Sequence, residues 1–180
     1  LDPQSGTSLE IGSSGDTMTV PSGATFNVAG TLQSGGAAVA NTPAFHVYKS
    51  GNQTVSNNTA TNLTWESEFY DTDSAFASNK FTVPSGKGGT YVFFYLLKGG
   101  SQPDSTYIQG WLQKNGSDLD SQLSRSKDYI STANEIHLTG HYTDVASAGD
   151  YYEIRVFQNS GGSLDFLSEG CSFWGYKLIT

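Results

Sequence analysis

The feature that most constrains this chain is the segment 91–97, Tyr-Val-Phe-Phe-Tyr-Leu-Leu, which is apolar on both faces of any strand that it forms. An antiparallel strand in an isolated sandwich normally alternates, because one face meets the core and the other meets water. The closing segment, 170–179, is bulky on both sides in the same way. Its two faces carry Cys171 and Phe173 on one side and Trp174, Tyr176 and Leu178 on the other.

We interpret both segments as strands that are covered twice, once by the opposite sheet and once by a neighbouring subunit. Trp174, Tyr176 and Leu178 are then predicted to face a subunit interface, while Cys171 and Phe173 face the interior. Cover by long loops of the same chain is the alternative. Cys171 is the only cysteine, so no intramolecular disulfide can form, and we expect a buried, inert thiol.

Further alternating segments recur at short intervals from residue 43 onward, and no segment is a credible helix. They are residues 44–49, 64–70, 107–114, 135–142 and 151–158. Asn115-Gly116 is a strong hairpin signal, and Phe76 and Phe81 bracket a second short turn. About eight strands joined by tight turns predict an all-β fold, a β-sandwich or jelly roll.

Residues 1–42 have a different texture, with Phe26 as their single aromatic residue and no Lys, Arg or His. Apolar pairs recur about every eight residues, as expected of very short strands with tight turns. The pairs are Leu9 and Ile11, Met18 and Val20, and Phe26 and Val28. One copy cannot bury such strands, but several chains wrapped around an axis can. We predict a β-rich fibrous stem and hinge over 1–42 and a head over 43–180; a disordered linker is the alternative for the stem.

The charge pattern excludes two classes of partner. The formal net charge is −8, and the nine Lys and Arg residues are scattered, so no basic stripe favours nucleic acid or an anionic membrane surface. No run of 18 apolar residues could span a bilayer. The sequence opens with Leu1 rather than Met, and we expect it to be a fragment of a longer protein.

The sequence carries no common catalytic motif, and we predict that the chain is not an enzyme. It lacks the Gly-x-Ser-x-Gly, P-loop and His-Glu-x-x-His patterns. Glu66 and Glu68 could in principle form a glycosidase pair, but alternate carboxylates on a strand are typical of a solvated face. The expected strand places Trp65, Ser67 and Phe69 opposite Glu66, Glu68 and Tyr70.

Metal chemistry is a minority hypothesis, and we expect no cofactor. Asp118 and Asp120 follow the Asn115-Gly116 hairpin and could bind Ca²⁺. His137 and His141 lie about 13 Å apart along one strand, too far to share one ion within a chain. One such histidine from each of three chains could still form a site on a threefold axis.

Recognition is the chemistry that remains, since the chain carries three Trp and ten Tyr residues. Tyr and Trp can stack on sugar rings or form protein hot spots, although most of them are expected in the core. The candidates for exposed ligand-binding side chains are those in predicted loops: Tyr70, Asp71, Asp73, Gln102, Asp104, Lys127, Asp128 and Tyr129.

A series of short motifs gives the head a family resemblance that runs from about Pro43 to Thr180. In order, the motifs are FYDTDSAF, KFTVP, GGTYVFFYLL, KNG, EIHL, AGDYYEI and SFWGYKLI. This order resembles the globular head of complement component 1q and the tumour-necrosis-factor superfamily. The resemblance implies a ten-stranded jelly roll that assembles as a tight homotrimer and binds ligands without catalysing a reaction.

The chain departs from the animal members of that family, since it has neither Gly-X-Y repeats nor a membrane helix. Residues 1–42 instead resemble the fibrous shafts of bacteriophage tail fibres. A trimeric shaft that ends in a trimeric jelly roll implies a receptor-binding tip on a virion, with a host cell-surface glycan or protein as its ligand. The alternatives are a structural virion protein without a receptor role, a complement-type head of a secreted or cell-surface protein and, last, a polysaccharide-cleaving enzyme.

Overall fold

The computed structural model of the chain contains two compact units, Leu1–Val39 and Ala40–Thr180. The structure describes residues 14–34, 37–38, 41–103, 105–119, 125–129 and 134–178. No helix among these residues is long and apolar enough to cross a membrane. The second unit is called the head below.

The described part of the first unit has one pair of strands, β1 (Gln33–Ser34) and β2 (Ala37–Ala38), which are antiparallel. Residues 18–20 and 26–28 form no strand in the single chain, and the fibrous stem, which requires several chains, stays a prediction. The apolar side chains there are exposed: 57% of Met18 and 58% of Phe26 face solvent. A strand this short needs a neighbour to pair with, and one chain does not supply it. The segment with Leu9 and Ile11 lies outside the described residues.

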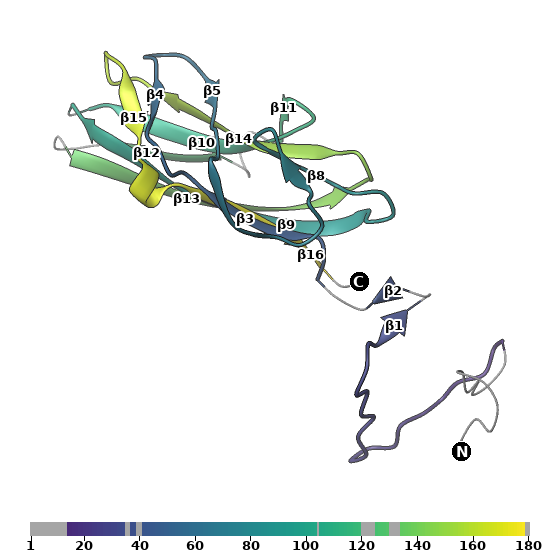
Figure 1. Cartoon of the computed structure of the whole chain (residues 1–180). Helices are drawn as coiled ribbons and strands as arrows, with labels where there is room; N and C mark the ends of the chain where they lie inside the picture. Colours follow the sequence, from purple (N-terminus) through teal and green to yellow (C-terminus); the bar gives the residue numbers. More distant parts are fainter. Residues whose placement is uncertain are drawn as a thin grey trace. The chain divides into compact units, whose positions relative to one another are not determined.

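The head is built from two antiparallel sheets, drawn as stacked layers in Figure 1. The first, which we call the β9 sheet, contains in order β4 (Gln53–Val55), β15 (Leu164–Phe166), β9 (Gly89–Gln102), β16 (Ser172–Lys177), β3 (Ala44–Tyr48) and β6 (Ser67–Asp71), with β13 (Asn134–Ala146) paired to β9. The second, the β14 sheet, contains β11 (Ser117–Asp118), β10 (Tyr107–Lys114), β14 (Tyr151–Gln158), β8 (Lys80–Thr82) and β7 (Phe76–Ala77), with β12 (Arg125–Tyr129) paired to β10 and β5 (Thr61–Asn62) paired to β14. The helical content of the described residues is one 3₁₀ turn, Ser168–Gly170.

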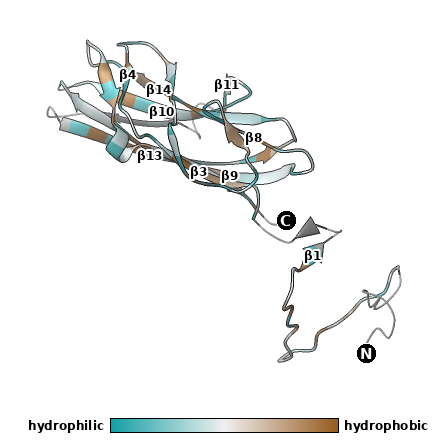
Figure 2. Ribbon diagram, viewed as in Figure 1, coloured by the Kyte–Doolittle hydropathy of each residue, from teal (hydrophilic) through white to brown (hydrophobic). Residues whose placement is uncertain are grey.

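The core lies between the two sheets and is rich in aromatic rings. Phe45 on β3 stacks on Phe81 of β8 with ring centroids 4.6 Å apart, and Phe93 on β9 lies 4.2 Å from Tyr152 of β14. Phe173 is fully buried beside them. Figure 2 shows brown, hydrophobic residues recurring along the strands of the head, because one residue in two points inward. The predicted all-β sandwich is confirmed.

Two tight hairpins occur where the sequence predicted them. Asn115 and Gly116 have φ angles of 54° and 76°, and they join β10 to β11. Ser78 and Asn79 have φ angles of 52° and 65°, and they join β7 to β8. Two consecutive residues with positive φ are typical of a type I′ turn, whose twist matches that of the paired strands.

Candidate functional site

The outer face of the β9 sheet carries a row of five rings on five neighbouring strands, which we call the aromatic row. The row follows the register of the strand pairs β6–β3, β3–β16, β16–β9 and β9–β13. Its members are Tyr70, His46, Trp174, Phe94 and His141. Directly opposed side chains share one face of a sheet and contact one another.

Ring geometry confirms that the aromatic row is continuous. Trp174 and Phe94 are stacked with centroids 5.5 Å apart, and His46 lies 5.3 Å from Trp174. At the two ends, the centroid of Tyr70 is 6.0 Å from that of His46, and the centroid of His141 is 6.4 Å from that of Phe94. Partial burial among these rings lowers the pKa of His46, because desolvation disfavours the charged imidazolium.

Phe69 extends the aromatic surface and corrects one expectation. The alternating pattern placed Phe69 on the same face as Trp65, yet Trp65 is buried and Phe69 is 66% exposed. The register sets Glu68 opposite the buried Val47, so the next residue, Phe69, falls on the outer side of the sheet. The irregularity between His46 and Val47 leaves Phe69 without a partner in β3. The Phe69 ring now lies 4.5 Å from Tyr48 and 4.7 Å from His46, outside the sandwich.

Strand β16 separates its two faces as the sequence indicated. Cys171, Phe173 and Gly175 are buried, whereas Trp174, Tyr176 and Leu178 are partly exposed. A Cβ at Gly175 would lie only 2.8 Å from Phe93 Cδ1 and from the Val92 carbonyl oxygen, so the close packing of β16 on β9 requires glycine there. The role of Trp174, Tyr176 and Leu178 at a subunit interface stays a prediction.

The thiol of Cys171 lies inside the head. Its Sγ is 3.2 Å from the Lys98 backbone nitrogen, which donates to it, and burial raises the pKa of the thiol. A raised pKa leaves the group protonated and unreactive near neutral pH.

Two of the predicted ligand-binding carboxylates bind the chain's own groups. Asp71 accepts hydrogen bonds from the backbone nitrogens of Ala75 and Phe76, at 2.9 and 2.8 Å. Asp73 accepts a hydrogen bond from Thr72 Oγ1 and lies 3.6 Å from Lys87 Nζ. Both carboxylates therefore shape the turn between β6 and β7.

Most of the predicted ligand-binding residues are on strands, so their assignment to loops was wrong. Tyr70 and Asp71 are on β6, Gln102 ends β9, and residues 127–129 pair with β10 as part of β12. Strand β9 runs on past the apolar stretch 91–97, and β12 carries no apolar alternation that could mark it in the sequence. The candidates on strands do not form one site. Strand β6 is at one edge of the β9 sheet, strands β16 and β3 separate it from β9, and β12 belongs to the β14 sheet. Asp104 lies outside the described residues. The ligand-binding role of all eight stays a prediction.

Asp118, the candidate calcium ligand, binds two neutral donors. Its Oδ1 accepts from Trp111 Nε1 at 2.7 Å and from Gln113 Nε2 at 2.8 Å, which fixes the β10–β11 hairpin over β10. Asp120 lies outside the described residues. Within the described ranges, no group of three His, Cys, Asp or Glu residues could hold a metal ion.

Comparison with known proteins identifies the fold of the head. The globular domain of zebrafish complement 1qA is 18% identical, with a TM-score of 0.54 over 76% of this chain and 97% of that one. Murine APRIL is 12% identical, with a TM-score of 0.54 over 75% of this chain and 98% of that one. Eiger TNF from S. frugiperda is 17% identical, with a TM-score of 0.50 over 75% of this chain and 91% of that one.

No family model matches the chain, and no curated protein sequence matches it. The structural likeness confirms a two-sheet sandwich resembling the complement 1q and tumour-necrosis-factor jelly roll. At these identities the likeness concerns the fold alone.

Proposed function

We propose that the chain is a non-catalytic binding protein that works as a homotrimer, with its subunits meeting through the outer face of the β9 sheet. The observation that carries this proposal is the aromatic row. Interfaces are enriched in aromatic residues and depleted of charged ones at their centre. Three successive cross-strand rows on this face, the aromatic row and its two neighbours, contain no Asp, Glu, Lys or Arg in the described strands.

The first unit supports the same arrangement independently. Its apolar side chains Met18, Val20, Phe26 and Val28 are exposed in the single chain. Three copies wound around one axis would cover them, as in other fibrous β-structures. Two parts of the chain therefore favour one symmetry, and such agreement between separate features supports the proposal.

We place this trimer at the tip of a bacteriophage tail fibre, where it binds a host cell-surface glycan or protein. The support is the fibre-like sequence of residues 1–42 ahead of a jelly-roll head. The virion is the proposed location. A structural virion protein and a complement-type head of a secreted or cell-surface protein are the rival assignments that the experiment must separate.

The test is saturable binding of the fluorescently labelled full chain to a panel of bacterial strains, with excess unlabelled chain as competitor. We expect competed binding to some strains and none to their neighbours in the panel. Competed binding to animal cells alone would favour the complement-type assignment. Absence of binding to every strain would contradict the receptor role, and release of reducing ends from host polysaccharide would contradict the non-catalytic assignment.

A further inference from the structure

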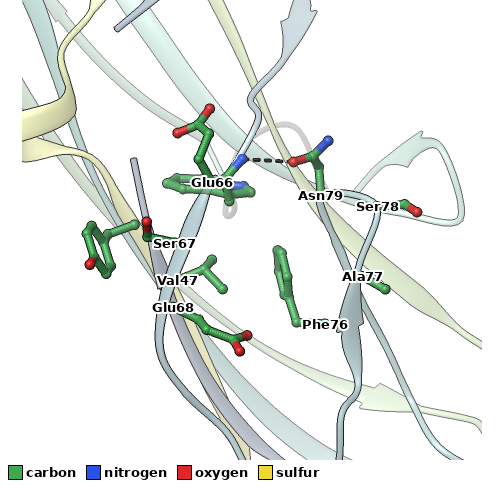
Figure 3. A pocket seen from close by; sticks show the side chains of 10 residues that line it. Val47, Glu66, Ser67, Glu68, Phe76, Ala77, Ser78 and Asn79 are labelled. Carbon is green, nitrogen blue, oxygen red and sulfur yellow. Dashed lines mark hydrogen bonds between the residues drawn. The ribbon is translucent and has the colours of Figure 1, made fainter. Parts of the chain in front are cut away.

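A pocket opens at the edge of the sandwich, between edge strands β6 and β7. Its volume is about 450 Å³, within the range of small-molecule sites. All of its lining residues belong to one chain, and they come from β3, from residues 65–68 and from the β7–β8 hairpin. Figure 3 shows the Val47 and Phe76 side chains pointing toward each other between these segments.

The lining combines aromatic rings with a buried indole N–H, that of Trp65, which has no acceptor among the described residues. Phe76 is partly buried and Trp65 is only 8% exposed. The Trp65 backbone nitrogen donates to Asn79 Oδ1 at 2.8 Å, which ties the pocket floor to the β7–β8 turn (Figure 3). The indole Nε1, however, is buried without an acceptor among the described residues. A buried indole N–H usually has a partner, and leaving it without one is costly.

The two carboxylates beside the pocket differ in their partners. Glu66 Oε1 lies 3.0 Å from Nζ of the buried Lys49, and Figure 3 shows its carboxylate directed away from Phe76. Burial raises the pKa of Glu66, but hydrogen bonds from Thr64 and Lys49 outweigh it and lower the pKa. Glu68 is exposed and makes no hydrogen bond or ion pair with the described residues. Of the two carboxylates that line the pocket, only that of Glu68 is therefore without an ion-pair partner among the described residues.

These groups select among ligand chemistries. An ammonium group could pair with Glu68 but cannot accept from the Trp65 N–H. A phosphate or carboxylate could accept from the N–H but is repelled by Glu68. Hydroxyl groups donate and accept, and the apolar face of a sugar ring packs on an aromatic wall. We propose that this pocket binds a neutral saccharide ring, with hydroxyls donating to Glu68 and accepting from Trp65 Nε1 while the ring packs on Phe76.

This inference rests on the proposed binding function and names the ligand class. It requires no subunit contact. Because the indole N–H is covered in the unbound chain, we expect a lining side chain to change rotamer on binding.

The experiment follows the Trp65 indole signal of the full chain in a proton–nitrogen correlation NMR spectrum, assigned with Trp65→Phe. The neutral probes are methyl glycosides of glucose, galactose and N-acetylglucosamine. The charged probes are N-acetylneuraminic acid and putrescine, and N-acetylglycinamide is an uncharged peptide probe. We expect at least one neutral glycoside to shift the signal in a saturable way and the other three probes to leave it unchanged.

Two variants locate the site. Glu68→Gln should weaken binding of the neutral glycoside about tenfold, because it replaces a charged acceptor by a neutral one. Glu169→Gln, an exposed carboxylate that does not line the pocket, should leave binding unchanged. The proposal is overturned if no neutral glycoside shifts the signal, if a charged or peptide probe shifts it instead, or if Glu68→Gln binds as tightly as the parent. Glycoside binding in a chain that binds no cells would contradict the receptor role and leave this pocket standing.

Discussion

The outer faces of the two sheets differ in the side chains that they expose to solvent. On the β14 sheet, Glu153 and Arg155 point outward, and Lys80 Nζ lies 4.4 Å from the ring centroid of Tyr151. Trp111 on this side is 4% exposed and donates to Asp118 of the neighbouring hairpin, and the partly exposed rings of Tyr107 and Phe157 stack on each other. On this face, charged side chains meet the solvent and a hairpin of the same chain covers Trp111.

The central rows of the outer face of the β9 sheet carry neither charged side chains nor a covering hairpin among the described residues. Its central rows hold rings, aliphatic side chains and small polar groups, and Phe69 and Tyr70 at its edge are 66% and 45% exposed. Charge is found toward one end, where Lys98 pairs with Glu169 and Glu135 at 2.9 and 3.0 Å. The hydrogen bonds that Lys98 Nζ donates to these two carboxylates raise the pKa of Lys98. The comparison shows how to read a strand that is apolar on both faces. One face packs in the core of the sandwich, and only the residues of the outer face indicate whether a partner covers the strand.

The largest effect is expected inside the sandwich, which both sheets share. Phe173→Ala removes a fully buried ring that packs against Phe45 at 4.9 Å, and it should lower the free energy of unfolding by about 3–5 kcal/mol. Urea unfolding followed by circular dichroism measures this loss. A loss below about 1 kcal/mol would mean that Phe173 is not a core residue.

The next effect sets one outer face against the other. Trp174→Ala should remove an interface ring in every subunit and weaken assembly by about 2–4 kcal/mol per subunit, with the sandwich of each chain intact. Phe157→Ala is the matched control, because Phe157 is a partly exposed ring on the outer face of the β14 sheet. Sedimentation velocity should show dissociation for the first variant alone. Equal behaviour of the two variants would remove the contrast between the faces.

A smaller effect concerns how the β14 sheet closes its own face. Asp118→Ala removes the acceptor used by Trp111 Nε1 and Gln113 Nε2, two side chains that are almost fully buried. We expect a loss of about 1–3 kcal/mol in thermal or urea unfolding, without a change of oligomeric state. The neighbouring Ser117→Ala is the control, since Ser117 is exposed. Dissociation of the Asp118→Ala variant would indicate an interface on the β14 sheet and contradict its proposed location on the β9 sheet.

The smallest effect is a pH dependence of the free energy of unfolding that arises from His46 on the outer face of the β9 sheet. The pKa of His46 is lowered by burial, so the unfolded chain binds a proton more readily than the folded one. Stability should therefore decline as the pH falls below the ordinary histidine pKa of about 6.5. His46→Gln should flatten the unfolding free energy between about pH 7.5 and pH 5.5, and His137→Gln, an exposed residue of β13, should not. A slope that survives in His46→Gln would contradict this cause.

Much of the head could be predicted because burial follows simple alternation there. Strands β10 and β14 occupy the predicted residues 107–114 and 151–158, and the Asn115-Gly116 turn lies where its dipeptide indicated. The predicted segment 44–49 also alternates, since Phe45, Val47 and Lys49 are buried and the residues between them are not. Alternation predicts such facing because residues two positions apart in a strand lie on the same face of the sheet.

The candidate sites could be predicted only in part, since they depend on contacts between distant segments. The register that sets Glu68 opposite the buried Val47 turns Phe69 outward, and no pattern within 64–70 shows which residue of β3 Glu68 will pair with. The alternating pattern predicted that Glu66 and Glu68 share a solvated face. In the structure Glu66 forms an ion pair with Lys49, and Glu68 forms none with the described residues. One signal was available: a lysine at an inward position needs a carboxylate, and Lys49 implied a partner.

The molar mass of the chain in solution tests the central claim most directly. Light scattering coupled to gel filtration should give three times the chain mass of 19.2 kDa. Because the aromatic row lies wholly within the head, residues 43–180 alone should also elute as a trimer. A monodisperse monomer of the head at micromolar concentration would contradict the account, since the outer face of the β9 sheet would then be stable in water without a partner.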